Sequence, residues 1–333
     1  MNKITNALVA ISILFAFTAA NAGELTVTGN METTYRSEGG AVTGNPLGMD
    51  RELKFAGSTE LDNGITVAVM QDTSDNLGYG NSQIAFTHAL GTIYVGSDSD
   101  PVDGVDDVTP SAYEEANGSG SGTYVDIGSL AGQMGIGAKV ALPYGVDINT
   151  KYYVKPDGVK NGDNSLSADA ASNVESATST VIGIDLGALD AAAENAKVTL
   201  GYAEGGRTAT IAAQDMEELT AAFNYAYGPV KIGLQKKRNT LGKDTGGVAR
   251  HHDTILGVAY AVNDQLSVSL NRYTSTRSDD TNANNETQET DAINVGYTMG
   301  GMTIGFQEAS TDNANYILAG KDDSRTLGVS VAF

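Results

Sequence analysis

The sequence contains no cysteine and no tryptophan, only six prolines, and 20 lysines and arginines against 41 aspartates and glutamates in 333 residues. Without cysteine the chain has neither a disulfide framework nor a cysteine-ligated zinc site. A formal charge of −21 excludes the basic face of a nucleic-acid-binding protein, so we expect no nucleic-acid partner. Beyond the first 22 residues, no stretch approaches the ~20 apolar residues that a transmembrane helix needs.

The N-terminus has the order of residues found in a secretory signal peptide. A basic residue, Lys3, precedes an apolar stretch at residues 7–20, and small residues end the segment at Ala22. The apolar stretch is too short to cross a bilayer as a helix. We therefore expect a signal peptide at residues 1–22, cleavage after Ala22, and one domain at residues 23–333. A buried N-terminal helix is the alternative.

From residue 25 onward, apolar and polar residues alternate with a period of two. Leu25, Val27 and Tyr35 fall on one face of the first such segment, and Glu32 and Arg36 on the other. This alternation is typical of a strand with one apolar face. We count sixteen segments, at residues 25–36, 52–55, 65–69, 84–86, 92–95, 134–142, 148–154, 182–186, 198–202, 219–227, 230–235, 256–260, 266–270, 293–297, 302–306 and 327–333.

The connections between these segments alternate between short and long. Seven are short and carry turn residues, at 61–64, 90–91, 142–145, 188–196, 227–229, 262–264 and 299–301. Eight are long and polar, at 37–49, 72–82, 98–123, 156–177, 204–216, 237–252, 274–289 and 308–323. This plan predicts an all-β fold, a transmembrane antiparallel barrel of 16 strands with short periplasmic turns and long extracellular loops. A secreted soluble β-sandwich, β-solenoid or adhesin is the alternative.

If the apolar stripe faces lipid, the polar stripe faces the lumen. The polar stripe carries glycine near the middle of many strands, at Gly135, Gly137, Gly183, Gly201, Gly233, Gly257, Gly296, Gly305 and Gly328. Glycine weakens a strand interior, so its abundance on one face predicts that space is kept open there. Sixteen strands leave an aqueous channel. The alternative is that these glycines only ease the curvature of the barrel.

The connection between the fifth and sixth segments contains seven carboxylates and no base between residues 98 and 115. With this loop, the strand count and the terminal residues Leu327, Val329, Val331 and Phe333, the chain resembles the general porins of Gram-negative outer membranes. Those proteins are trimeric, and their third loop folds into the lumen, where its acids face bases on the wall. Their C-terminal strand, ending in Phe, is an assembly signal. The Pro-Glu-Phe-Gly-Gly stretch common in their third loop is absent here.

The resemblance implies a constriction with an acidic side and a basic side. The acidic side would be Asp103, Asp106, Asp107, Glu114 and Glu115. Parity along the strands gives Arg36, Lys54, Lys139 and Lys151 as basic candidates on the wall, which is a small set. Charges within ~8 Å of a permeating ion are poorly screened, and carboxylate rings favour cations. We predict a water-filled, cation-preferring channel for passive diffusion. A merely solvated outer loop remains the alternative for the acids.

Other functions are less favoured. A substrate-specific channel could stack sugars on Tyr94, Tyr153 and Tyr273, although scattered tyrosines more often fill space. The resemblance further implies a homotrimer, contact with outer-membrane lipid and lipopolysaccharide, and recognition of the C-terminal strand, ending in Phe333, by the barrel-assembly machinery.

Chemistry and metal binding have weak support in the sequence. Asp98 and Asp100 could hold a loop-bound Ca²⁺, but the segment lacks the spacing of an EF-hand. His251-His252-Asp253 could suggest a metal or hydrolase site, but acyl transfer needs a serine, a histidine and an orienting group to converge, and the two histidines fall in an expected outer loop. We therefore predict that the protein is not an enzyme and has no required cofactor.

Overall fold

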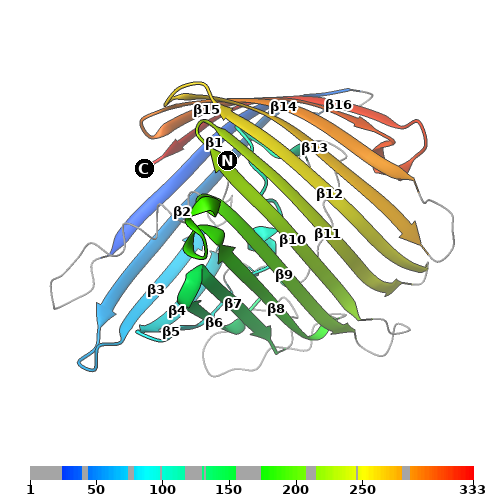
Figure 1. Ribbon diagram of the computed structural model, residues 1–333. Helices are drawn as coiled ribbons and strands as arrows, with labels where there is room; N and C mark the ends of the chain where they lie inside the picture. The colour runs from blue at the N-terminus through cyan, green and yellow to red at the C-terminus, as the bar shows by residue number, and fades with distance from the viewer. Residues whose placement is uncertain are drawn as a thin grey trace.

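The computed structural model describes residues 25–39, 44–73, 79–97, 100–116, 130, 133–154, 174–207, 215–244, 247–279 and 286–333. They form one closed antiparallel barrel (Figure 1). Its strands are β1 (Thr26–Glu38), β2 (Leu47–Glu60), β3 (Thr66–Thr73), β4 (Tyr79–His88), β5 (Gly91–Gly96), β6 (Gly135–Leu142), β7 (Val146–Tyr153), β8 (Val174–Asp185), β9 (Ala196–Arg207), β10 (Met216–Tyr227), β11 (Val230–Asp244), β12 (Gly247–Ala261), β13 (Leu266–Asp279), β14 (Thr287–Met299), β15 (Met302–Asp312) and β16 (Lys321–Ala332). The predicted barrel of sixteen strands is confirmed.

Short 3-10 segments are the only helices in these ranges. They are η1 (Asp103–Val105), η3 (Pro143–Gly145), η4 (Leu186–Ala188), η5 (Ala191–Ala193) and η6 (Ala314–Tyr316). Within the described residues, no helix has the length and apolar character needed to span a membrane. The predicted signal peptide and its cleavage site after Ala22 lie outside the described residues.

Along the strands the outward face is largely apolar, and the inward face carries most of the polar residues. On β11 and β12, Leu234 and Leu256 are exposed, whereas Gln235 and Ile255 between the outward positions are fully buried. Cross-strand partners share a face, so the paired register carries this alternation around the whole barrel. The outward stripe contains most of the exposed large apolar side chains of the chain. An exposed belt of this extent is characteristic of a barrel that lipid surrounds.

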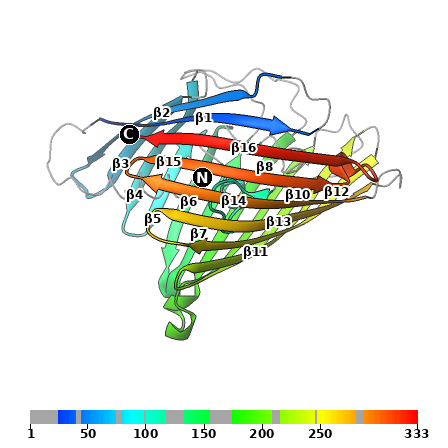
Figure 2. The same cartoon turned by 90° about the horizontal axis from the view of Figure 1, so that it is seen from above.

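The barrel closes where β16 pairs with β1 (Figure 2). The pairing extends to the last residue, because the Phe333 amide donates to the Gly29 carbonyl at 3.0 Å and the Gly29 amide donates to the Phe333 carbonyl at 2.9 Å. The Phe333 ring lies over Gly29, where a Cβ atom would overlap it. A side chain at position 29 would therefore interfere with the last contact that closes the barrel.

Seven short connections lie at one end of the barrel, as predicted. Gly228 and Gly300 have φ values of +55° and +61° there, in the region that glycine adopts without strain. The expected long connection at 237–252 is shorter than predicted, because β11 continues to Asp244 and β12 begins at Gly247. The ladder continues past the end of the apolar stripe, since pairing satisfies backbone groups whether or not the outward side chains are apolar.

Candidate pore constriction

Residues 100–116 of the third loop, which connects β5 to β6, lie inside the barrel. The Val102 amide donates to Ser179 Oγ on β8 at 3.0 Å, and the Val108 amide donates to Gln235 Oε1 on β11 at 3.1 Å. Farther along, the Tyr113 hydroxyl donates to Glu32 Oε1 on β1 at 2.8 Å. A segment that contacts strands so far apart around a closed barrel must cross its interior. The predicted inward fold of this loop is therefore confirmed for residues 100–116.

Wall glycines make the close approach of the loop possible. A Cβ atom at Gly233 or Gly257 would overlap Pro110, and one at Gly296 would overlap the Ala112 carbonyl. The same substitution at Gly305 or Gly328 would overlap the Tyr113 side chain. The space that was predicted at these five glycines is taken up by the loop, so it is not open to the channel. They form a furrow that the loop fills, and we call them the glycine furrow.

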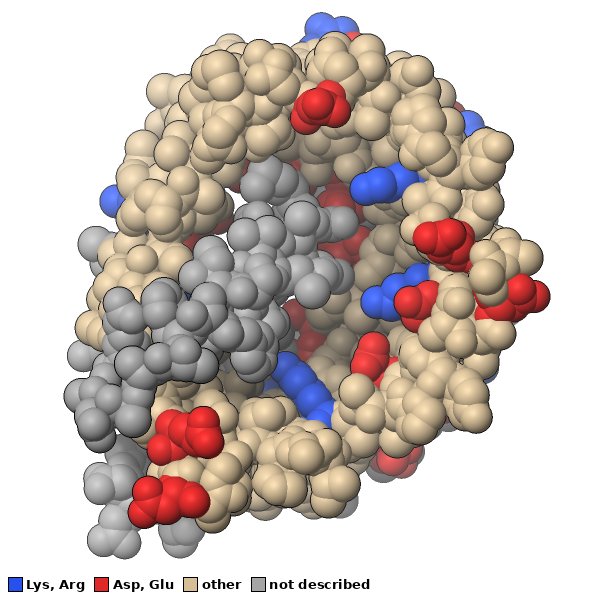
Figure 3. Space-filling view, turned by 60° about the vertical axis from the view of Figure 1, so that its left-hand side comes forward, with Lys and Arg blue, Asp and Glu red and all other residues tan. Residues whose placement is uncertain are grey.

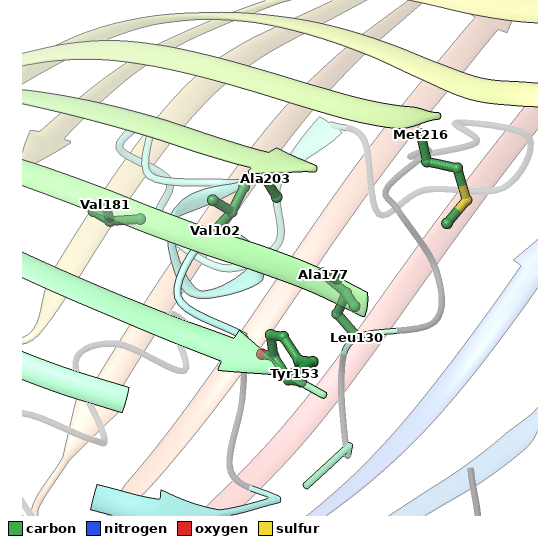
Figure 4. Close-up of a cluster of buried hydrophobic side chains, with 7 residues drawn as sticks. All are labelled: Val102, Leu130, Tyr153, Ala177, Val181, Ala203 and Met216. Carbon is green, nitrogen blue, oxygen red and sulfur yellow. The ribbon is translucent and has the colours of Figure 1, made fainter. Parts of the chain in front are cut away.

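Two apolar clusters hold the loop at its ends. Val102 packs with Leu130 and with the wall residues Tyr153, Ala177, Val181, Ala203 and Met216 (Figure 4). At the other end, Ala116 packs with Ile255, Tyr273, Ala292 and Ala309. The side chains of Tyr94, Tyr153 and Tyr273 are 2 %, 0 % and 0 % exposed, so they present no ring to a passing sugar. They fill space beneath the loop instead.

The predicted acidic residues lie on the part of the loop that is inside the barrel. Asp103, Asp106 and Asp107 are half-buried near β11, and we call these three the acidic segment. Glu115 is buried, and Glu114 lines a cavity of about 350 Å³ between the loop and the wall. The other residues of this cavity are Glu32, Thr34, Arg36, Met49, Asp50, Tyr113, Gln307 and Thr326. Figure 3 shows the hollow of the barrel with basic and acidic side chains on its wall.

The four predicted bases lie on the inner face, but the structure does not gather them into one cluster. Arg36 Nε lies 2.6 Å from Glu38 Oε1, and Lys54 on β2 stands opposite Asp72 on β3. Lys139 Nζ lies 5.1 Å from the centre of the Tyr94 ring. Lys151 is fully buried, with Nζ 4.7 Å from the centre of the Tyr153 ring. Parity therefore predicted the face of each base but not its partners.

One buried base was missed in the sequence. Lys237 on β11 has a fully buried side chain, and its Nζ atom lies 2.8 Å from Glu218 Oε1 on β10. It interacts electrostatically with Asp106, Asp253, Asp103 and Asp107. The prediction placed Lys237 in an outer loop because the apolar stripe ends at Leu234. Continuing the alternation through Gly233 and Gln235 would have identified it as lumenal.

The wall formed by β1, β2 and β3 is also acidic. Apart from Glu60 at the short-turn end, the inward face of β1, β2 and β3 carries Glu32, Glu38, Asp50, Glu52 and Asp72, against Arg36 and Lys54, as the paired register shows. Five carboxylates minus two bases leave a surplus of three carboxylates on these strands. Residues 100–116 of the loop and the inward face of β1, β2 and β3 therefore both carry more acid than base.

The environment of the loop raises the pKa of several groups. Burial, and then the neighbouring Asp107, raise the pKa of Asp106 to about 9, against the opposing effect of Lys237. Burial, and then Glu114, raise the pKa of Glu115 to about 7. Burial also raises the pKa of Asp100, although hydrogen bonds from Ser179 and the Val102 amide oppose this. The charge of the loop therefore depends on pH near neutrality.

The structure bears on the Ca²⁺ candidates Asp98 and Asp100 and on the position of His251. Asp98 lies outside the described residues, and Asp100 accepts hydrogen bonds from Ser179 and from the Val102 amide at 2.9 Å. No group of three or more metal-ligating side chains occurs among the residues that the structure describes. The placement of His251 in an outer loop was wrong. It lies buried on the inner face of β12, with its ring 5.5 Å from that of Tyr316 in η6.

A known protein family and several solved structures match this chain along nearly its whole length. The family model described as Gram-negative porin matches residues 7–333. No curated protein matches the chain. Among solved structures, the chain is similar to the anion-selective porin from Comamonas acidovorans, with a TM-score of 0.70, 15% identity, and coverage of 94% of this chain and 100% of that chain.

Two further solved structures share the fold at low identity. A loop L8 deletion mutant of OmpT from Vibrio cholerae has a TM-score of 0.72 and 11% identity, covering 94% of this chain and 100% of that chain. Salmonella typhi OmpF in complex with daunomycin has a TM-score of 0.68 and 13% identity, covering 93% of this chain and 98% of that chain.

Proposed function

Because the chain belongs to the Gram-negative porin family, we propose that its channel prefers cations. The coarser activity follows from the family: the protein is a non-enzymatic porin of the outer membrane, through which small hydrophilic solutes diffuse passively. The fold alone does not imply a preference for cations, since the similar Comamonas acidovorans protein is anion-selective. The preference must therefore come from the side chains that line this particular lumen.

The observation that carries the proposal is the surplus of carboxylates on both sides of the lumen. The acidic segment of the loop and the five acids on β1, β2 and β3 outnumber the bases Arg36, Lys54 and Lys237 on these surfaces. A narrow, low-dielectric passage strengthens the effect of such charges on a passing ion. Cations are attracted into this passage and anions are repelled.

Changing Asp103, Asp106 and Asp107 together to Asn is expected to lower the cation-to-anion permeability ratio by about twofold or more, because unscreened charges act within ~8 Å. The measurement is the reversal potential of the purified protein in a planar bilayer under a salt gradient. The control changes Asp62, Glu194 and Asp264, which lie exposed at the short-turn end, to Asn, Gln and Asn. An anion-directed reversal potential in the wild type would refute cation preference.

The cation preference is expected to increase as the pH is raised from about 6 to about 10. Glu115 loses its proton near its pKa of about 7, and Asp106 near its pKa of about 9, so each step adds a negative charge to the loop. The reversal potential measured across this range tests the sign. In an Asp106→Asn variant the upper step should disappear, and a cation preference that falls with rising pH would contradict the assignment.

The family and the fold also support proposals about processing and partners. We propose that residues 1–22 are removed after Ala22 and that the protein assembles as a homotrimer, as a solved form of Vibrio cholerae OmpT does. The apolar belt would contact outer-membrane lipid and lipopolysaccharide. The barrel-assembly machinery would recognise the strand that ends in Phe333 before this strand pairs with β1. Light scattering of the purified protein would test the trimer.

A further inference from the structure

The acidic segment of the third loop is attached to the wall at β11. Gln235 Nε2 donates to the Val105 carbonyl at 2.8 Å, and its Oε1 accepts from the Val108 amide at 3.1 Å. Two residues farther along the same inner face lies Lys237, with its side chain fully buried. The polar contacts of Gln235 position the backbone of the loop. Lys237 provides the charge beside it.

Lys237 is placed between two sets of carboxylates. One set belongs to the wall, where Glu218 on β10 lies 2.8 Å from Nζ and Asp253 on β12 is the cross-strand partner of Lys237. The other set is the acidic segment, whose three carboxylates all interact electrostatically with Lys237. Both sets would repel each other across the interface between loop and wall. A buried cation between them turns this repulsion into attraction.

We propose that Lys237 is the positioning residue of the constriction, the buried cation that holds the acidic segment against β11. This inference rests on the proposed function, in which the acidic segment contributes to the preference for cations. Lys237 would determine where that segment lies. Removing one partner of a buried ion pair leaves an uncompensated charge, which is strongly destabilising. Without Lys237, Glu218 and Asp253 would push the acidic segment away from the wall.

The absence of cysteine makes the position of the loop directly measurable. Gly104 lies within η1 and lines a pocket between the loop and the wall residues Tyr94 and Lys139, and a Cβ atom there meets no heavy atom within 4 Å, so Gly104→Cys places a unique, partly enclosed thiol beside the acidic segment. The readout is the rate at which a thiol-specific maleimide modifies this residue in the otherwise complete protein. A loop that leaves the wall is expected to react faster.

In the Gly104→Cys background, Lys237→Met is expected to increase the modification rate about tenfold, because the buried carboxylates lose their counter-charge. Lys237→Arg keeps the charge and should react like the parent. Lys237→Met combined with Glu218→Gln removes both members of the wall pair and should return the rate toward that of the parent. Modification that is equally fast in the single and double variants, or unchanged in Lys237→Met, would overturn the inference.

Glu218→Gln alone provides a test that does not depend on the folding of Lys237→Met. This variant removes the wall carboxylate that pairs with Lys237, so the charge of Lys237 attracts the acidic segment at least as strongly as before. The modification rate should be equal to or lower than in the parent, and a higher rate would contradict the inference. Failure of the proposed function has a different signature. It would appear as an anion-directed reversal potential in the wild type, whatever the modification rates are.

Discussion

Replacing Gly305 with leucine is expected to reduce the single-channel conductance roughly twofold. A Cβ atom at this position already overlaps the Tyr113 ring, and a leucine would occupy the place of that ring. Overpacking of this kind costs about 1–3 kcal/mol, comparable to the roughly 1.5–3 kcal/mol that a hydrogen bond to a charged group such as the Glu32 carboxylate contributes, so the bond from Tyr113 does not hold the ring in place against the leucine. The tip of the loop would move off the wall into the open lumen, where ions pass.

A compensating substitution tests this mechanism. Tyr113→Ala removes the ring and is expected to increase conductance, and Gly305→Leu with Tyr113→Ala should lie near the wild type, because the leucine then fills the vacated space. Gly183→Leu is the control, since a Cβ atom at Gly183 makes only ordinary contacts, the nearest at 3.6 Å from Lys197 Cε. Equal loss of conductance in the control and in Gly305→Leu would show that the furrow does not seat the loop.

The sequence was sufficient to predict the strands and their connections. Alternation such as Leu256, Val258 and Tyr260 depends only on neighbouring residues, and an outward apolar face is required along every strand that crosses lipid. The inward position of the third loop was predicted through the family resemblance. Its exact path was not, because the contacts of Tyr113 with Gly305 and Gly328 join residues about 200 positions apart.

The wrong assignments of strand ends and of the residues near them have one physical cause. The ends of β11 and β12 were placed where the apolar stripe stops, but backbone pairing continues to Asp244 and from Gly247. Lys237 and His251 were therefore assigned to an outer loop, although both are buried on the inner face. Alternation along a strand shows on which face a side chain lies but not which residue it contacts. It therefore could not show that Arg36 is paired with Glu38.

Changing Val258 to arginine is expected to destabilise the folded barrel by about 2 kcal/mol in a bilayer, because arginine on the lipid face costs about 2–4 kcal/mol at the midplane and about 0–1 kcal/mol near the interfaces. Val258 points outward from β12 between Ile232 and Leu270 on the adjacent strands, which places it within the apolar belt. The measurement is denaturant unfolding of the protein in lipid vesicles, compared with the wild type under the same conditions.

The matched control is Val262→Arg in the turn that follows β12. Val258 and Val262 are both 46% exposed, so in water the two substitutions would cost the same. In a bilayer they differ, because Val262 lies beyond Tyr260 at the end of the strand, where the cost of arginine falls to about 0–1 kcal/mol. A large difference between two valines of equal exposure therefore identifies hydrocarbon as the solvent of the outer face. Equal effects would mean that water covers both, and a barrel with water on its outer face would not conduct ions across a membrane.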